Sequence, residues 1–232
     1  MKIKQNLVNK NKYDIKCPYS MKVEYITFHN TDNDASAKNE VNYMISNNNE
    51  VSFHVAVDDI EAIQGIPFDR NAWHAGDGNG PGNRKSIGVE ICYNKLGANN
   101  PKFKKAEANA VEICAKLLKQ FNLGIDKLQP HKHWSGKNCP STTNHSEFIA
   151  RVGKQLNTLN NRESVDMDKI VLYFGDADLF AAVIIAQKFQ CPLMKKSDFE
   201  KSGLKASEII QIGGNKEDTD RFMTMKNACK YL

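Results

Sequence analysis

The sequence predicts an α/β fold, in which a larger first domain is followed by a small second domain of βαβ type. Short runs rich in β-branched and aromatic residues alternate along the chain with longer stretches whose apolar residues recur at helical spacing. A polar stretch without periodicity, at 157–164, separates the two parts. We therefore expect a first domain over residues 1–158, a linker over 159–166 and a second domain over 167–232.

The composition of the 232 residues is ordinary for a soluble globular protein, with 41% apolar and 25% charged side chains. The net charge of +5 arises upstream of Val165. A mildly basic first part suits an anionic polymer, although most such excess is solvated surface. We find no run typical of a signal peptide or a membrane span, so we expect a protein made in the cytoplasm without its own export signal, with no membrane or nucleic-acid partner.

The first expected strand covers 23–28, where Val, Tyr, Ile and Phe predominate. His29 and Asn30 follow at its tip, where a core strand would hold a side chain rigidly. Taken alone, His29 is either a buried structural histidine or a metal ligand.

A helix and a hairpin are expected next. A stripe of apolar residues at helical spacing runs over 37–48. Two alternating runs, 51–57 and 60–64, are joined by two aspartates and predict a hairpin whose first strand carries His54.

The most informative strand is expected over 86–93, because apolar residues flank a single carboxylate, Glu90, on both sides. Burying that carboxylate alone would be costly, so Glu90 would need a metal-bound water, a lysine or a backbone donor as partner. The alternative is an edge strand with Glu90 in solvent.

The Gly-rich loop 73–83 carries His74, and no capped helix is expected to follow it. We expect this loop to form either a wall of a cleft or a plain surface loop.

Two helical stripes, 103–121 and 148–156, are expected to complete the first domain. A domain of about 65 residues buries only about 60% of the surface that its unfolded chain exposes, so we expect the second domain to pack against a copy of itself or against the first. Its expected elements follow a βαβ order that predicts a small parallel sheet: strands at 170–175, 192–194 and 208–214, and helices at 179–189 and 219–229, the last capped by Thr219.

The stretch from Pro130 to Pro140 is the densest in chemistry, with two imidazoles, two ammonium groups, a thiol and an indole. His131 and Cys139 offer a nitrogen and a soft sulfur that could meet at one Zn²⁺, with a further ligand supplied from elsewhere. The other five of the six cysteines lack the spacing of a disulfide framework and are expected to be reduced and mostly buried.

Taken together, residues 20–157 resemble the type 2 N-acetylmuramoyl-L-alanine amidases, a family that includes phage endolysins and the peptidoglycan recognition proteins. The resemblance implies a central mixed β-sheet flanked by helices, and a Zn²⁺ held by two histidines and a cysteine, here His29, His131 and Cys139. The motifs that carry it are, in chain order, His29, Trp73-His74-Ala75-Gly76, Ser86-Ile87-Gly88-Val89-Glu90 and the stretch from His131 to Cys139.

The same resemblance implies a mechanism. The zinc would bind a water and make hydroxide available, with Glu90 as general base and Lys137 neutralising the oxyanion. The bond cleaved would join the lactyl group of N-acetylmuramic acid to L-alanine in peptidoglycan. Some members have a tyrosine where this chain has Phe53, which has no proton to give, so the acid and base roles fall on Glu90. Four further residues are candidate substrate contacts, with structural roles left open: Asn30, His54, His74 and Trp134.

Parts of the second domain resemble one copy of the type 2 cell-wall-binding repeat, namely 178–182, 192–194, 212–214 and 220–224. The resemblance implies a tail that anchors the enzyme to a wall polymer of Gram-positive bacteria, and a single copy favours a homo-oligomer formed through this domain. We therefore expect a phage-type endolysin that stays in the host cytoplasm until lysis and then acts on the cell wall.

Two alternatives stay open. Recognition proteins of the same fold bind peptidoglycan without cutting it, although they typically lack the cysteine ligand that this chain has in Cys139. A purely structural zinc site would be closed by four ligands, and His133 could serve as the fourth.

Overall fold

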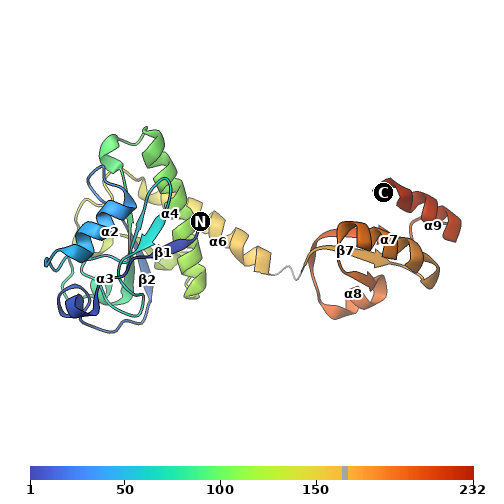
Figure 1. The fold of residues 1–232 in the computed structure, drawn as a ribbon, viewed down its shortest axis with the longest axis horizontal. Helices are drawn as coiled ribbons and strands as arrows, with labels where there is room; N and C mark the ends of the chain where they lie inside the picture. The colour runs from blue at the N-terminus through green and yellow to red at the C-terminus, as the bar shows by residue number, and fades with distance from the viewer. Residues whose placement is uncertain (164–166) are drawn as a thin grey trace. The chain divides into compact units, whose positions relative to one another are not determined.

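The computed structural model describes residues 1–163 and 167–232, which form two compact units, Met1–Leu159 and Asn160–Leu232 (Figure 1). None of the helices in the described ranges combines the length and apolar character that crossing a bilayer would require.

The first unit is built on a six-stranded mixed sheet. Strands β3 and β4 pair antiparallel, whereas the other neighbours pair parallel, in the order β1-β4-β3-β5-β2-β6. The expected α/β class with a mixed sheet is confirmed. The strands are β1 (Ile3–Gln5), β2 (Tyr25–Asn30), β3 (Val55–Val57), β4 (Ala62–Gln64), β5 (Ser86–Ile91) and β6 (Leu128–Pro130).

Six α-helices accompany the sheet: α1 (Tyr13–Lys16), α2 (Ala37–Ser46), α3 (Pro81–Lys85), α4 (Pro101–Gln120), α5 (Lys132–Ser135) and α6 (His145–Glu163). Helix α2 packs on β3 and β4, and α4 packs on β2, β3 and β5. The apolar stripe of α4 is buried from Phe103 to Leu118, which anchors the core behind the central strands.

Several boundaries differ from the sequence prediction. The hairpin strands are shorter than expected, so His54 precedes β3 instead of lying within it. Contrary to expectation, a short helix, α3, ends the Gly-rich loop, although Gly80 at its N-cap has no side chain to cap it. Helix α6 continues to Glu163, so the expected linker is helical as far as residue 163, and 164–166 lie outside the described residues. Leu156 and Leu159 pack on the first unit's core, which explains why the helix persists.

The second unit contains the small parallel sheet that the βαβ order predicts. Its strands β7 (Met167–Tyr173), β8 (Leu193–Lys195) and β9 (Ala206–Ile212) have the order β8-β7-β9. Its helices are α7 (Leu179–Phe189), α8 (Lys196–Ser202) and α9 (Arg221–Ala228). Helix α8 was not expected, and the predicted cap Thr219 is wrong, because the Asp220 side chain accepts from Phe222 N and Met223 N.

Candidate metal centre and cleft

The sheet register places three side chains of the site beside one another. In the parallel pairing of β2 with β5, His29 lies opposite Glu90. On the other side of β2, Phe28 pairs with Pro130 of β6, and His131 follows directly. Because parallel strands end at the same edge of a sheet, His29, Glu90 and His131 meet at the carboxyl ends of β2, β5 and β6.

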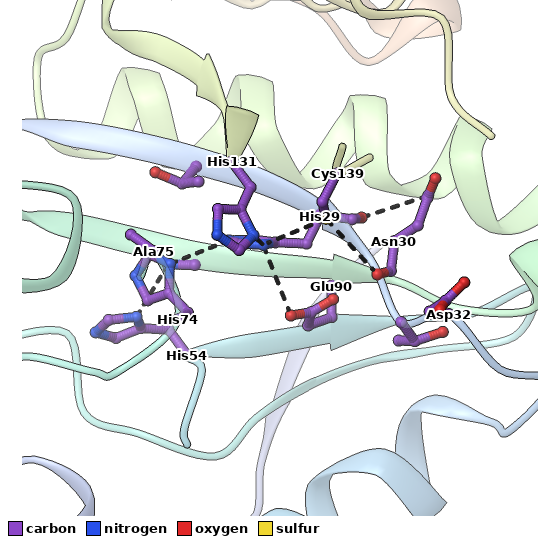
Figure 2. Close-up of polar contacts among 12 residues, drawn as sticks. His29, Asn30, Asp32, His54, His74, Ala75, Glu90, His131 and Cys139 are labelled. Carbon is purple, nitrogen blue, oxygen red and sulfur yellow. Dashed lines mark hydrogen bonds and ion pairs between the residues drawn. The ribbon is translucent and has the colours of Figure 1, made fainter. Parts of the chain in front are cut away.

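His29, His131 and Cys139 form a buried group whose ligand atoms all lie within 4.8 Å of one another. The Nδ1 atoms of His29 and His131 are 3.0 Å apart, and the Sγ atom of Cys139 lies 3.8 Å from Nδ1 of His29 (Figure 2). Two imidazole nitrogens and one thiol sulfur are a donor set that suits Zn²⁺ with one coordination position left open. The three residues therefore fit the metal that the sequence predicted.

Glu90 points into this group from the central strand β5. Its Oε1 atom lies 3.9 Å from Nδ1 of His29, whereas its Oε2 atom is buried without a hydrogen-bond partner in the described part of the chain. Burial and the Glu40 carboxylate raise the pKa of Glu90 to about 8, while the Lys137 ammonium lowers it. The edge-strand alternative is wrong, because β5 lies between β3 and β2.

Burial keeps the three ligand side chains uncharged when no cation is present. It lowers the pKa of His29 well below the usual value, with help from His74, His131 and Lys137, and it lowers the pKa of His131. It raises the pKa of the Cys139 thiol to about 11. Neutral imidazoles are ready to bind a metal, and a bound cation would favour the thiolate.

His133 does not join the metal group among the described residues. Its ring packs edge-on against Trp134, with 4.7 Å between ring centroids. The described donors therefore do not include the fourth ligand that a closed structural zinc site would need.

A cleft of about 500 Å³ runs from the metal group toward α2. Lys137 lines the cleft beside the metal ligands and Glu90. Glu40 and Tyr43 of α2 also line it, although neither was predicted as a site residue. A polar or aromatic side chain on an amphipathic helix does not by itself indicate a site, so only the tertiary structure identifies these two residues.

The candidate substrate contacts occupy different places. Asn30 and His74 line the cleft, but both are largely buried. Oδ1 of Asn30 accepts from the backbone N–H groups of Thr142 and Thr143, which holds that segment beside the site. Trp134 donates from Nε1 to Thr27 Oγ1 at 2.9 Å, and the described cleft lining does not include it.

The His54 side chain links two backbone segments through hydrogen bonds. Its Nδ1 atom accepts from Gly88 N at 3.0 Å, and its Nε2 atom donates to Arg70 O at 2.9 Å. Both bonds need the neutral ring, and burial lowers the pKa of His54 to about 4. The described cleft lining does not include His54, whose contacts are those of a structural residue.

This arrangement predicts an acid-sensitive first unit. Because the pKa of His54 falls from 6.5 in the unfolded chain to about 4 in the fold, its contribution to stability is complete above pH 6.5 and is lost as the pH drops toward 4. The loss is expected to reach about 1.4 kcal/mol per pH unit. His54→Asn, which keeps an acceptor for Gly88 N, should show a flatter pH dependence.

Urea unfolding followed by tryptophan fluorescence measures this effect, since both tryptophans, Trp73 and Trp134, belong to the first unit. Wild type and variant are compared from pH 7 to pH 4, both with a chelator, because acid also releases metals. Parallel stability curves for the two proteins would contradict the role given to His54.

The sequence model of the family described as N-acetylmuramoyl-L-alanine amidase matches residues 19–142. The N-acetylmuramoyl-L-alanine amidase XlyB of Bacillus subtilis is 56% identical over 160 residues, which cover 67% of this chain and 50% of XlyB. The chain thus spans about half the length of this curated relative.

Solved structures agree with the fold of the first unit. The structure of PlyL is 56% identical and superimposes with a TM-score of 0.65, over 67% of this chain and 99% of PlyL. A mutant endolysin from Bacillus subtilis is 40% identical, with a TM-score of 0.61, over 66% of this chain and 99% of that structure. Because the family match covers more than half of the sequence and every residue of the metal group, this chain belongs to the N-acetylmuramoyl-L-alanine amidase family.

Proposed function

We propose that this chain is a zinc-dependent endolysin that hydrolyses the amide bond between N-acetylmuramic acid and L-alanine in peptidoglycan. The observation that carries the proposal is the convergence of two imidazole nitrogens and a thiol sulfur beside a carboxylate oxygen without a partner, at one end of a cleft. Membership of the family and the similarity to XlyB and to a Bacillus subtilis endolysin support it.

His29, His131 and Cys139 would hold the zinc. When bound, the metal supplies a Lewis acid and makes water a stronger nucleophile at neutral pH. Glu90 takes one proton from the attacking water and delivers it to the amide nitrogen as the carbon–nitrogen bond breaks. Lys137 lines the same cleft, and its charge stabilises the negative oxygen that develops on the attacked carbonyl.

Phe53 also lines the cleft but has no proton to donate. The described cleft lining contains one tyrosine, Tyr43, whose ring is two-thirds exposed on α2. These observations support a mechanism in which Glu90 alone carries the proton.

The alternative is a module of the same fold that binds peptidoglycan without cutting it. Cys139 argues against it, because the thiol completes a metal group that binding alone would not need. The unpartnered Oε2 atom of Glu90 argues in the same direction, since a buried carboxylate without a partner costs stability, and a role in catalysis explains why that cost is tolerated.

Chemical analysis of the products tests the proposed activity. Purified zinc-loaded protein is mixed with Gram-positive peptidoglycan, and new free L-alanine amino termini are expected to accumulate while reducing sugars stay constant. Reducing sugars without new amino termini would contradict the amidase assignment. Binding to the walls with neither product would favour the binding module.

We propose that the second unit anchors the enzyme to a wall polymer and self-associates. Aromatic rings that could stack on a saccharide are exposed on it, with Phe174 55%, Phe180 65% and Phe222 68% exposed. Its small core, made of a few residues of β7, β9, α7 and α9, supports association with a second copy.

Removal of residues 164–232 is expected to lower lysis of intact Gram-positive cells strongly while leaving hydrolysis of soluble peptidoglycan fragments nearly unchanged. The reason is that anchoring raises the local concentration at the wall without touching the chemistry. Turbidity loss on a panel of species measures the first effect, and release of amino termini from fragments measures the second. Equal lysis of the same species by both forms would remove the anchoring role.

A further inference from the structure

The ring of His74 lies directly behind the metal ligand His29. Its Nδ1 atom is 3.0 Å from Nε2 of His29 (Figure 2). Its Nε2 atom is 3.2 Å from the backbone carbonyl oxygen of Ser86. The two imidazoles meet nearly at right angles, with ring centroids 5.0 Å apart. A short chain of hydrogen bonds therefore leads from the backbone of β5 through His74 to His29.

Hydrogen-bond chemistry fixes the direction of this chain. A carbonyl oxygen can only accept, so Nε2 of His74 must carry the hydrogen. A buried imidazolium without a carboxylate partner is costly, so the ring is neutral and its Nδ1 atom is an acceptor. Nε2 of His29 must then carry a hydrogen and donate it to His74.

The consequence falls on the opposite side of the His29 ring. A neutral histidine that is protonated on Nε2 exposes a lone pair on Nδ1. That Nδ1 atom is the one that faces the site, 3.0 Å from Nδ1 of His131 and 3.9 Å from Oε1 of Glu90. The other tautomer would direct an N–H group at the metal.

We propose that His74 is a positioning residue that sets the tautomer and the orientation of His29, so that the Nδ1 lone pair of His29 is preformed for the metal. The inference rests on the proposed zinc site and adds to it a residue that contacts one of the candidate ligands. It also replaces the expectation that His74 contacts substrate, since both ring nitrogens are already used within the protein.

Gly88 explains why the ring can lie where it does. A Cβ atom on Gly88 would come within 2.8 Å of the His74 ring, closer than real side chains approach. The same glycine donates its N–H to His54. The imidazole of His74 therefore lies flat on β5, and the strand leaves it little room to turn.

Nuclear magnetic resonance of the full, zinc-loaded chain tests the proposal without any substitution. The expected result is a scalar coupling across the hydrogen bond between Nε2 of His29 and Nδ1 of His74, with the hydrogen bonded to His29. A wild-type protein in which His29 carries its hydrogen on Nδ1, or shows no coupling to His74, would overturn the proposal.

Two variants of matched shape test the effect on the metal. His74→Leu removes the acceptor, whereas His74→Asn keeps an oxygen close to the place of Nδ1. Loss of an outer partner of a ligating histidine typically costs about 10–100-fold in metal affinity. Competition with a chromophoric chelator should show this loss for the full-length Leu variant and most of the wild-type affinity for the Asn variant.

The outcomes separate this inference from the proposed function. If the wild type binds no zinc, the zinc site itself fails. If the wild type binds zinc and the Leu variant, still folded by circular dichroism, binds it equally well, only the role of His74 fails. An Asn variant as weak as the Leu variant would indicate that the ring's packing matters and not its acceptor.

Discussion

Cys139→Ser is expected to lose its zinc and its amidase activity together. The thiol is one of only three protein donors in the described metal group, and a serine hydroxyl is a poor ligand for zinc. Since loss of an outer partner alone costs about 10–100-fold in metal affinity, loss of a ligand should cost at least about 100-fold. Metal analysis after gel filtration and release of L-alanine amino termini measure the two effects.

A stability measurement adds an independent readout. A metal that binds only the folded state stabilises it, by about 2.7 kcal/mol at a free concentration 100 times the dissociation constant. Zinc should therefore raise the unfolding temperature of the wild type and have little effect on the variant. Cys114→Ser is the matched control, because Cys114 is also buried in the first unit but lies in α4, away from the metal group. It should lose stability and keep zinc. A Cys139→Ser protein with full zinc content would contradict the assigned ligand set.

Glu90→Gln is expected to lower the turnover number by about 10²–10⁴-fold, the range typical for removal of a general base or acid. The amide has the shape of the carboxyl group but cannot accept the proton of the attacking water. Zinc content should be unchanged, because Glu90 is not in the metal group. The combination of bound zinc and lost turnover separates this variant from Cys139→Ser.

Although Glu90→Gln should lower turnover, it is expected to stabilise the zinc-free protein. Burial raises the pKa of Glu90 from 4.5 to about 8, so the folded state disfavours the carboxylate, at a cost that grows as the pH rises from 4.5 to 8. In the zinc-free protein at pH 7, Glu90→Gln should therefore raise the unfolding temperature. Glu24→Gln is the control, because Glu24 is exposed and pairs with Lys85 on the surface. Equal turnover of Glu90→Gln and wild type would exclude Glu90 as the base.

The sequence was most informative where local pattern and chemistry coincide. The strand that carries His29 was predicted because β-branched and aromatic residues predominate in it, and the strand that carries Glu90 was predicted because apolar residues flank a single carboxylate. His131 and Cys139 were predicted as partners because both are metal ligands in one short segment. The family resemblance then supplied their common partner, His29, which no local pattern indicates.

The rest depends on long-range contacts that leave no local trace. Strands β1 and β6 have three residues each and lie at the two edges of the sheet, and Pro130 lacks the N–H that a central strand needs. Helix α8 has no apolar stripe for a pattern to detect. The link from Ser86 through His74 to His29 joins residues that are 12 and 45 positions apart, so only the folded sheet brings them together.

The strand order also determines when the proposed metal site can form. His29 and His131 are 102 positions apart and meet only when β6 has added to β2, while Cys139 arrives 110 positions after His29. Closing loops of this length is a late and slow event in folding, because the entropic cost comes before the contacts that offset it. The three candidate ligands would therefore come together only after β6 has paired with β2, and zinc uptake during refolding would report that pairing.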